Sequence, residues 1–163
     1  MKLTVLATSL FLALPVLAET PDAKTSKEFF QDWQLNCVEK GELKQCSVSQ
    51  ALRTQEGKTA AVINASYVKG EITLEFGMPL MMDLTTPVAV KVDGDDLAKY
   101  AYNACNNQAC FVIRKDDEKL LAAFRKGTAA QMTLKSFPGQ NIQMNVSLKG
   151  FGAAINELKK RSK

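Results

Sequence analysis

The chain has 163 residues, with 21 Lys and Arg against 17 Asp and Glu, a formal net charge of +4 and no His. This length suits one globular domain with its own hydrophobic core. The absence of His excludes Ser-His-Asp and Cys-His nucleophile systems, His-dependent zinc sites and imidazole acid–base chemistry. The small positive charge falls short of the basic surface typical of nucleic-acid-binding proteins, so we expect no nucleic acid among the partners.

The first 18 residues have the pattern of a secretory signal peptide. Lys2 is followed by an apolar run over residues 3–17, and small residues occupy the −3 and −1 positions before Glu19. The run is too short for a stable membrane span, and the change to polar residues at Glu19 disfavours the alternative of a buried N-terminal helix. We therefore expect cleavage after residue 18, an exported protein that is periplasmic or secreted, and no transmembrane span in the mature form.

The residues after the signal peptide divide into a short polar segment and one domain. Residues 19–27 are rich in Thr, Ser, Asp and Lys, which predicts a flexible N-terminal segment. Residues 28–163 show no internal repeat, low-complexity tract or interdomain linker. The sequence therefore predicts a single folded domain over residues 28–163.

Alternation of apolar and polar residues with period two dominates this domain. Trp33, Leu35 and Cys37 share one face of the first such segment, and Cys46 repeats the pattern after the turn near Gly41. The same alternation recurs in three further segments, which are residues 72–76, 88–92 and 142–148. Such segments are typical of antiparallel strands with one buried face, and we expect about eight strands in all.

Two segments depart from the alternation and predict short helices. Residues 116–127 begin with three acidic residues, continue with an apolar stripe and end in Arg-Lys-Gly, which suits the two ends of a helix. In residues 151–158 apolar side chains recur at positions i, i+4 and i+7, ahead of a basic tail. Two short helices among many strands favour an all-β antiparallel sandwich over an α/β fold.

The four cysteines fall in two close pairs, Cys37 with Cys46 and Cys105 with Cys110. Export favours disulfides. Four cysteines allow three pairings, and we predict the two local ones because they need only hairpin-sized loops. The alternative is a redox dithiol or a four-thiolate metal site, but neither pair has the Cys-x-x-Cys spacing typical of such sites.

Two groups of residues are candidates for a partner surface, Met78, Met81 and Met82 around a proline, and Tyr100 with Tyr102. Exposed Met side chains form adaptable binding surfaces, and alternating Tyr residues offer amphipathic contact area. Each group has an alternative interpretation. The Met residues would instead be buried under their loop, and the Tyr residues would pack beneath the helix that follows.

Other features point away from catalysis and cofactors. Trp33 lies near Phe30 and Asp32 and could form an aromatic surface, but its place in an alternating strand favours the core. The Asp residues around Gly94 resemble a calcium loop whose further oxygen ligands do not follow, so we expect a hairpin turn. The acids at residues 116–118 suit a helix start, and no phosphate-binding loop or Ser nucleophile motif occurs. We expect neither an enzyme nor a bound cofactor or metal.

Six elements in a fixed order resemble the invasion-associated locus B family of exported bacterial proteins. They are Phe30-x-Asp-Trp-x-x-x-Cys37, the second cysteine Cys46, Gly77-Met-Pro-Leu80, Val90-Lys-Val-Asp-Gly94, the pair Cys105-x4-Cys110 and the ending Val146-Ser-Leu-Lys-Gly-Phe151. The resemblance covers nearly the whole mature chain. It implies a periplasmic or secreted single-domain protein with an immunoglobulin-like β-sandwich, and it supplies no catalytic residue or ligand. The family loop after Pro-Leu is usually Gly-rich, whereas here it reads Met81-Met-Asp-Leu84.

The resemblance supports two hypotheses of function. The first is an exported, non-enzymatic binding protein that contributes to host-cell invasion or virulence through a protein or envelope partner. The alternative is a periplasmic structural or stress-tolerance protein that supports envelope integrity, for which the basic residues near the C-terminus are the motive.

Overall fold

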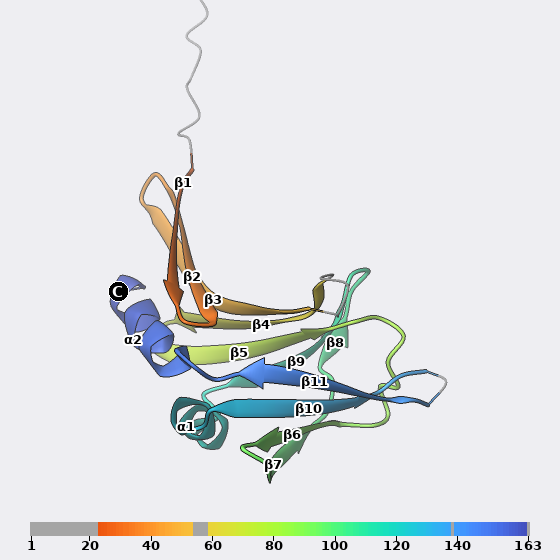
Figure 1. Ribbon diagram of the computed structural model, residues 1–163. Coiled ribbons are helices and arrows are strands. Elements are labelled where there is room, and N and C mark those ends of the chain that lie inside the picture. The colour runs from red at the N-terminus through yellow and green to blue at the C-terminus, as the bar shows by residue number, and fades with distance from the viewer. Residues whose placement is uncertain (1–22, 54–58, 138, 163) are drawn as a thin grey trace, which may run out of the picture.

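The computed structural model describes residues 23–53, 59–137 and 139–162 of the chain. In this part eleven strands form two antiparallel sheets, and two helices lie together at one side of them (Figure 1). The all-β antiparallel fold with two short helices, predicted from the sequence, is confirmed. The predicted signal peptide, residues 1–18, lies outside the described residues.

The larger sheet has seven strands in the order β1-β2-β3-β4-β5-β9-β8. Their bounds are β1 Lys24–Phe30, β2 Trp33–Lys40, β3 Leu43–Arg53, β4 Thr59–Val68, β5 Glu71–Met78, β8 Ala104–Cys105 and β9 Cys110–Lys115. The first five strands lie side by side in chain order, each antiparallel to the next. Buried residues alternate along β2, β4 and β5, as expected for strands with one face on the core.

The smaller sheet has four strands in the order β11-β10-β6-β7. Their bounds are β6 Val88–Val92, β7 Asp95–Tyr100, β10 Ala129–Lys135 and β11 Asn141–Ser147. Asp93 and Gly94 join β6 to β7 with φ of 51° and 96°, the left-handed conformation that a two-residue hairpin turn requires. The Asp93 carboxylate accepts the backbone N–H groups of Thr128 and Ala129, so the predicted hairpin turn is also tied to β10.

The two helices follow the predicted segments, with different ends. Helix α1 spans Glu118–Lys126, and the Asp117 side chain caps it by accepting the Leu120 N–H at 3.0 Å. Helix α2 spans Phe151–Arg161, one turn longer than the predicted 151–158. Its buried stripe ends at Leu158, as predicted, and the basic residues that follow continue the helix for a further turn. Helix α2 contacts β1 to β4 on the face of the larger sheet, and it also contacts α1.

A chain of aromatic side chains forms the centre of the core. The Trp33 ring meets Phe151 edge-on at 4.9 Å between centroids, Phe151 meets Phe124 at 5.5 Å, and Phe124 meets Phe76 at 6.2 Å. All four side chains are almost completely buried. The chain joins both helices to the larger sheet, and the prediction that Trp33 is a core residue is confirmed.

Strand β1 corrects the predicted N-terminal boundary. Residues 24–27 were expected to belong to a flexible segment, but Lys24 to Phe30 pair with β2 in an unbroken antiparallel register. The sequence pattern did not reveal this strand because its residues show no apolar face, and most of them are exposed. Backbone hydrogen bonding to β2, rather than burial, places them in the sheet.

Candidate functional site

The loop between β5 and β6 is held against the turn between β10 and β11. The Asp83 N–H donates to the Lys135 carbonyl at 2.7 Å, the Phe137 N–H donates to the Met81 carbonyl at 2.8 Å, and Met82 forms an isolated bridge with Ser136. These bonds join two segments that are distant in the sequence. The loop therefore has a defined conformation at this end of the molecule.

The Asp83 side chain organises the same loop from within. Its carboxylate accepts from the Thr85 hydroxyl at 2.6 Å, the Thr85 N–H at 3.0 Å and the Thr86 hydroxyl at 2.9 Å. The hydrogen bonds from Thr85 and Thr86 hold the pKa of Asp83 below its ordinary value. The Asp83 carboxylate thus stabilises the turn from within the loop.

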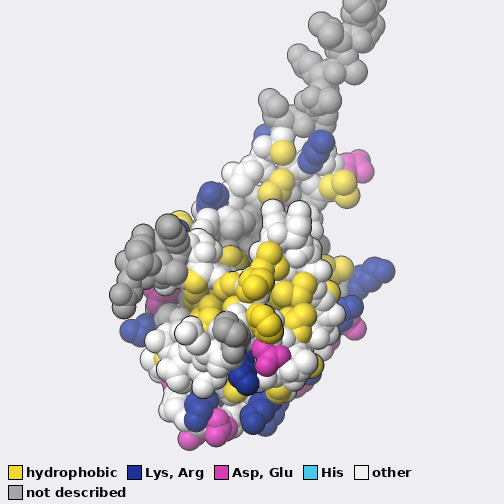
Figure 2. Space-filling model, turned by 90° about the vertical axis from the view of Figure 1, so that its right-hand side faces the viewer, with side chains coloured by type: hydrophobic (Ala, Val, Ile, Leu, Met, Phe, Trp, Pro, Cys, Tyr) yellow, Lys and Arg dark blue, Asp and Glu magenta, His cyan; other side chains and the backbone are white. Residues whose placement is uncertain are grey.

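Four large apolar side chains are exposed on these two segments, and we call them the loop patch. They are Leu80, Met81, Leu84 and Phe137, with exposed fractions of 40%, 68%, 50% and 70%. Figure 2 shows apolar side chains gathered at this end of the molecule, with acidic and basic side chains around them. An exposed apolar cluster with a polar rim is typical of an interaction site.

A hollow of about 300 Å³ lies next to the loop patch on the outer face of the larger sheet. Val62, Pro79 and the Phe111 ring are among the residues that line it, and Gly77 lies at its base. A Cβ atom at Gly77 would stand 3.4 Å from the Phe111 ring, an ordinary van der Waals contact, so a small side chain would fit at this position. Pro79 lines the hollow and is bonded to Leu80 of the patch, so the two features adjoin along the chain.

Only part of the predicted partner surface is exposed. Met81 is in the loop patch, and Met82 is half-buried against the core. Met78 is 1% exposed and Tyr100 is 7% exposed, so the prediction that they face a partner is wrong. Tyr102 is half-buried and packs on the core. The alternative interpretations therefore apply to these two residues, burial under the loop for Met78 and packing beneath the helix for Tyr100.

Tyr100 has a structural role that explains its burial. Its hydroxyl donates to Asp117 at 3.1 Å, and the Arg114 guanidinium lies 4.6 Å from its ring centroid. Burial, together with the Asp117 charge, raises the pKa of Tyr100 to about 12. Tyr100 thus connects β7 to the capped start of α1.

Sequence reasoning did not single out Phe111 or Phe137. Phe137 stands directly before Pro138-Gly139, a turn signal that predicts a loop, and loops lie on the surface. Phe111 has no such sign, because it alternates normally along β9. Its position over Gly77 depends on the pairing of β5 with β9.

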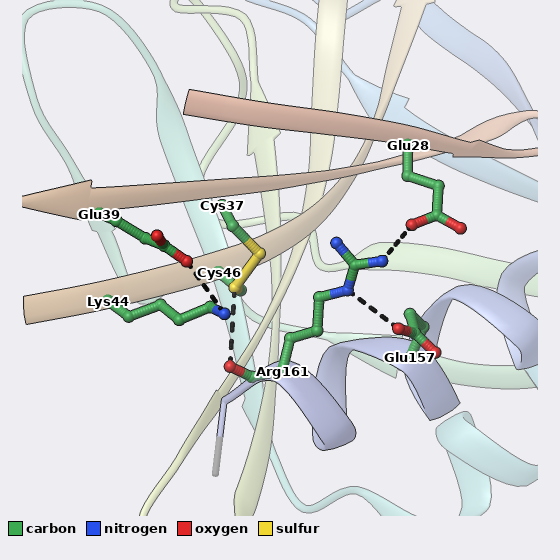
Figure 3. Close-up of a disulfide and its surroundings, with 7 residues drawn as sticks. All are labelled: Glu28, Cys37, Glu39, Lys44, Cys46, Glu157 and Arg161. Atoms are coloured by element: carbon green, nitrogen blue, oxygen red, sulfur yellow. Dashed lines mark hydrogen bonds and ion pairs between the residues drawn. A yellow bond between two sulfur atoms is a disulfide. The ribbon is translucent and has the colours of Figure 1, made fainter. Parts of the chain in front are cut away.

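The four cysteines form the two predicted disulfides, Cys37–Cys46 and Cys105–Cys110. Cys37 and Cys46 face each other on β2 and β3, and both are buried. Figure 3 shows this disulfide beneath the end of α2, where the Arg161 carbonyl oxygen lies 4.0 Å from Cys46 Sγ. The disulfide therefore staples the β2–β3 hairpin at the point where the C-terminal helix ends.

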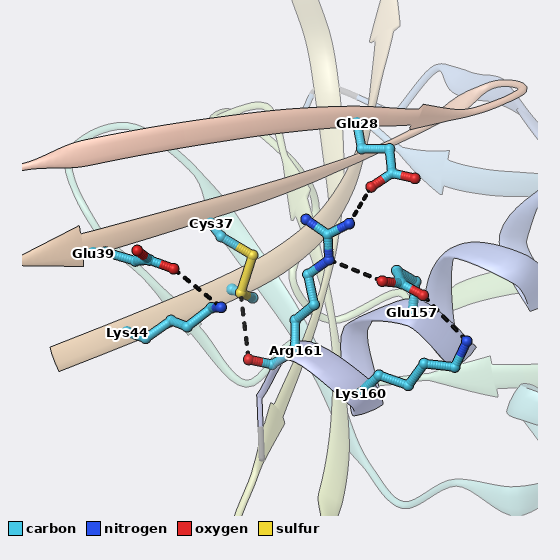
Figure 4. Close-up of polar contacts among 8 residues, drawn as sticks. Glu28, Cys37, Glu39, Lys44, Glu157, Lys160 and Arg161 are labelled. Atoms are coloured by element: carbon cyan, nitrogen blue, oxygen red, sulfur yellow. Dashed lines mark hydrogen bonds and ion pairs between the residues drawn. A yellow bond between two sulfur atoms is a disulfide. The ribbon is translucent and has the colours of Figure 1, made fainter. Parts of the chain in front are cut away.

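Charged side chains tie the end of α2 to β1. Arg161 pairs with Glu28 of β1 and donates to Glu157 at 2.9 Å, and Lys160 lies 3.3 Å from the other oxygen of Glu157 (Figure 4). The hydrogen bond from Arg161, followed by that from Lys160, holds the pKa of Glu157 below its ordinary value. Lys159 lies 5.6 Å from the centroid of the Tyr67 ring. The basic residues of the C-terminal tail that are described thus contact this chain itself.

The described residues contain neither a metal-binding cluster nor a membrane-spanning helix. No group of three or more His, Cys, Asp or Glu residues in this part of the chain is arranged to hold a metal ion. Within the same residues, no helix has the length and apolar character needed to cross a membrane.

Comparisons with known proteins agree on one relationship. The family model for the invasion associated locus B protein matches residues 33–159. Two invasion protein B homologs from Brucella abortus, one from strain 2308 and one from biovar 1 strain 9-941, are each 29% identical over 146 residues, which covers 86% of this chain and 83% of each relative. The crystal structure of invasion associated protein B from Bartonella henselae has the same fold, with a TM-score of 0.72 and 19% identity over 83% of this chain and 95% of that chain.

Proposed function

The chain belongs to the invasion-associated locus B family, and we propose that it is an exported, non-enzymatic binding protein that contributes to host-cell invasion or virulence. The name of the Brucella relatives, invasion protein B homologs, supports the biological context. The observation within this chain that carries the proposal is the loop patch at one end of the two sheets.

The loop patch has the physical properties of a binding surface. Its side chains are large and apolar, and exposing them to water is unfavourable unless a partner covers them. Met and aromatic residues are enriched in the buried centres of protein interfaces. Backbone hydrogen bonds hold the Met81 and Phe137 segments together before any partner arrives, which lowers the entropy cost of binding. The adjoining hollow offers space for an apolar side chain of the partner.

Export is supported by two independent features of the chain. The first 18 residues have the signal-peptide pattern. All four cysteines are in disulfides, which persist in the periplasm and outside the cell but are rare in reducing compartments.

Matched serine variants test the proposal. Met81→Ser and Phe137→Ser remove apolar surface from the loop patch, whereas Val68→Ser and Leu43→Ser do so at positions of similar exposure, 61% and 78%, outside the patch. We expect the patch variants to reduce binding of labelled protein to host cells, and invasion by a complemented deletion strain, while the control variants retain both. Thermal unfolding must show that all four variants remain folded. Equal binding by patch and control variants would refute the role of the patch.

Protease accessibility distinguishes the proposal from a role inside the envelope. Digestion on intact cells, or recovery from the medium, is expected for a protein that meets a host surface. Protection until the outer membrane is permeabilised would favour the structural or stress-tolerance role. The basic residues near the C-terminus were the reason for considering that role. Three of them, Lys159, Lys160 and Arg161, have contacts within the chain.

A further inference from the structure

Strand β1 is an open edge of the larger sheet. It pairs with β2 over seven residue pairs, from Lys24 with Glu39 to Phe30 with Trp33, and no other described strand lies on its far side (Figure 1). An edge strand presents a row of backbone N–H and C=O groups that can pair with another chain. Strand β1 is therefore a template for one more strand.

Two of the other three edges of the two sheets are protected, because strand β8 has only two residues and the pairing of β7 with β6 contains a register shift. Strand β11 has seven residues like β1, and its last carbonyl, that of Ser147, accepts from the side chains of Trp33 and Gln50. Unlike β1, it carries no charged residue that could select a partner. Strand β1 has seven residues, no Pro, no Gly and no register shift. It lacks the features by which edge strands usually avoid pairing, except for its lysines.

Those lysines are arranged to favour one partner, a second copy of the same strand. Residues that lie directly opposite each other in an antiparallel pair have their side chains on the same face of the sheet. When two copies of one strand pair symmetrically, the two-fold axis that relates them must therefore pass beside one residue, which then lies opposite its own copy. An axis beside Ser26 places Lys24 opposite Glu28 of the second copy, twice by symmetry, and Thr25 opposite Lys27. Axes beside Thr25, Lys27 or Glu28 create no such pair, and the last two oppose like charges. Among these axes, only the one beside Ser26 places a lysine, Lys24, in an ion pair across the interface.

We propose that β1 is a homodimer interface, in which two copies pair their β1 strands antiparallel about Ser26 and form one continuous sheet. The partner strand is a second copy of β1, because the order of charged residues along β1 is complementary to itself in this antiparallel pairing. Lys24 is exposed, and the Glu28 side chain is still 44% exposed although it contacts Arg161. Both side chains can therefore reach their counterparts across the axis.

Charge exchange tests this register specifically. We expect the wild type, expressed from the full-length gene and purified with its N-terminus defined by intact mass, to dimerise with concentration in sedimentation velocity. Lys24→Glu or Glu28→Lys alone should weaken the dimer about tenfold, because each opposes like charges at two symmetric places. The double variant should restore it. In the double variant, position 24 faces Glu39 and position 28 faces Arg161 of the same chain, and each is then a pair of like charges. A restored dimer therefore cannot result from improved contacts within the monomer.

Lys27→Glu is the matched control for the single variants. It makes the same charge change on the same strand, but its side chain lies on the other face opposite Thr25, so we expect little effect on the dimer. A monomeric wild type into the millimolar range would overturn the proposal, as would equal dimerisation by all variants or a double variant no better than the singles. If a variant does not fold, hydrogen exchange of the wild type decides, because amide protection in β1 must rise with protein concentration. Loop-patch variants should leave the dimer unchanged, so this test is independent of the proposed function.

Discussion

The indole N–H of Trp33 donates a hydrogen bond of 2.9 Å to the carbonyl of Ser147, which lies 114 positions further along the chain. Trp33 begins β2 in the larger sheet, and Ser147 ends β11 in the smaller one. The buried Gln50 side chain joins the same point, because its amide donates to the carbonyls of Ser147 and Asp32 and its oxygen accepts the Ser147 N–H at 3.1 Å. This network connects the two sheets where no strand pairing does.

Replacing Gln50 tests the importance of this connection. Gln50→Leu leaves the partly buried Ser147 N–H without its acceptor, and we expect the free energy of unfolding to fall by roughly 1–3 kcal/mol. Urea unfolding measures the change. Gln143→Leu makes the same substitution at an exposed site on β11 and should alter stability little. Equal effects of the two substitutions would show that the network contributes nothing specific.

The two disulfides should differ in their contribution to stability. Replacing Cys37 and Cys46 together by Ser opens the longer loop, for which the chain-entropy model gives about 2–3 kcal/mol, and places two hydroxyls in the core. We expect the melting temperature to fall by several degrees. The Cys105 and Cys110 double variant should lose less, because its loop is shorter and Cys105 is exposed. Peptide mass mapping of the native protein checks the pairing, and a Cys37–Cys105 bridge would contradict it.

Acid sensitivity should depend on Asp117. Burial raises the pKa of this carboxyl, but hydrogen bonds from Leu120, Arg114 and Tyr100 outweigh burial and hold the pKa below its ordinary value. Because the pKa is lower in the folded than in the unfolded chain, the stabilisation is complete above the ordinary value of about 4 and is lost as the pH falls through the folded pKa.

The substitution Asp117→Asn isolates this contribution. Asn retains an acceptor for the helix cap but does not titrate, so the decline of unfolding free energy below about pH 4 should become shallower. Urea unfolding at a series of pH values measures it. Asp95→Asn, which makes the same charge change at the exposed first residue of β7, serves as the control. Parallel pH profiles for Asp117→Asn and the wild type would count against the assignment.

Gly150, which precedes α2, should tolerate no side chain. Its φ is 87°, and a Cβ atom there would lie 1.9 Å from the Phe30 carbonyl oxygen. Gly41 has a φ of 60° with nothing within 4 Å of the same position. Gly41→Ala should therefore cost only the left-handed backbone strain, about 1–2 kcal/mol, whereas Gly150→Ala must also displace backbone. Comparable melting temperatures for the two variants would rule out the close approach at Gly150.

The parts of the fold that depend on residues close together in the sequence were predictable. Apolar alternation along β2, β5, β6 and β11 predicted strands, and the close spacing of each cysteine pair predicted the disulfides. Strands β1, β4, β8 and β9 were not placed from the sequence, and the structure has eleven strands in its described residues where about eight were expected. Strands β1 and β8 are held by backbone pairing with little burial, which leaves no apolar period to detect.

The candidate site was predictable only in outline. Local sequence patterns were sufficient to predict a loop rich in Met after β5, local pairing of the cysteines and a core position for Trp33. Packing of the whole chain buries Met78 and Tyr100, brings Phe137 beside Met81 on one surface and leaves β1 as an open edge. The physical reason is that periodicity reports which way a side chain points along its own strand, whereas exposure depends on what the rest of the chain places above it.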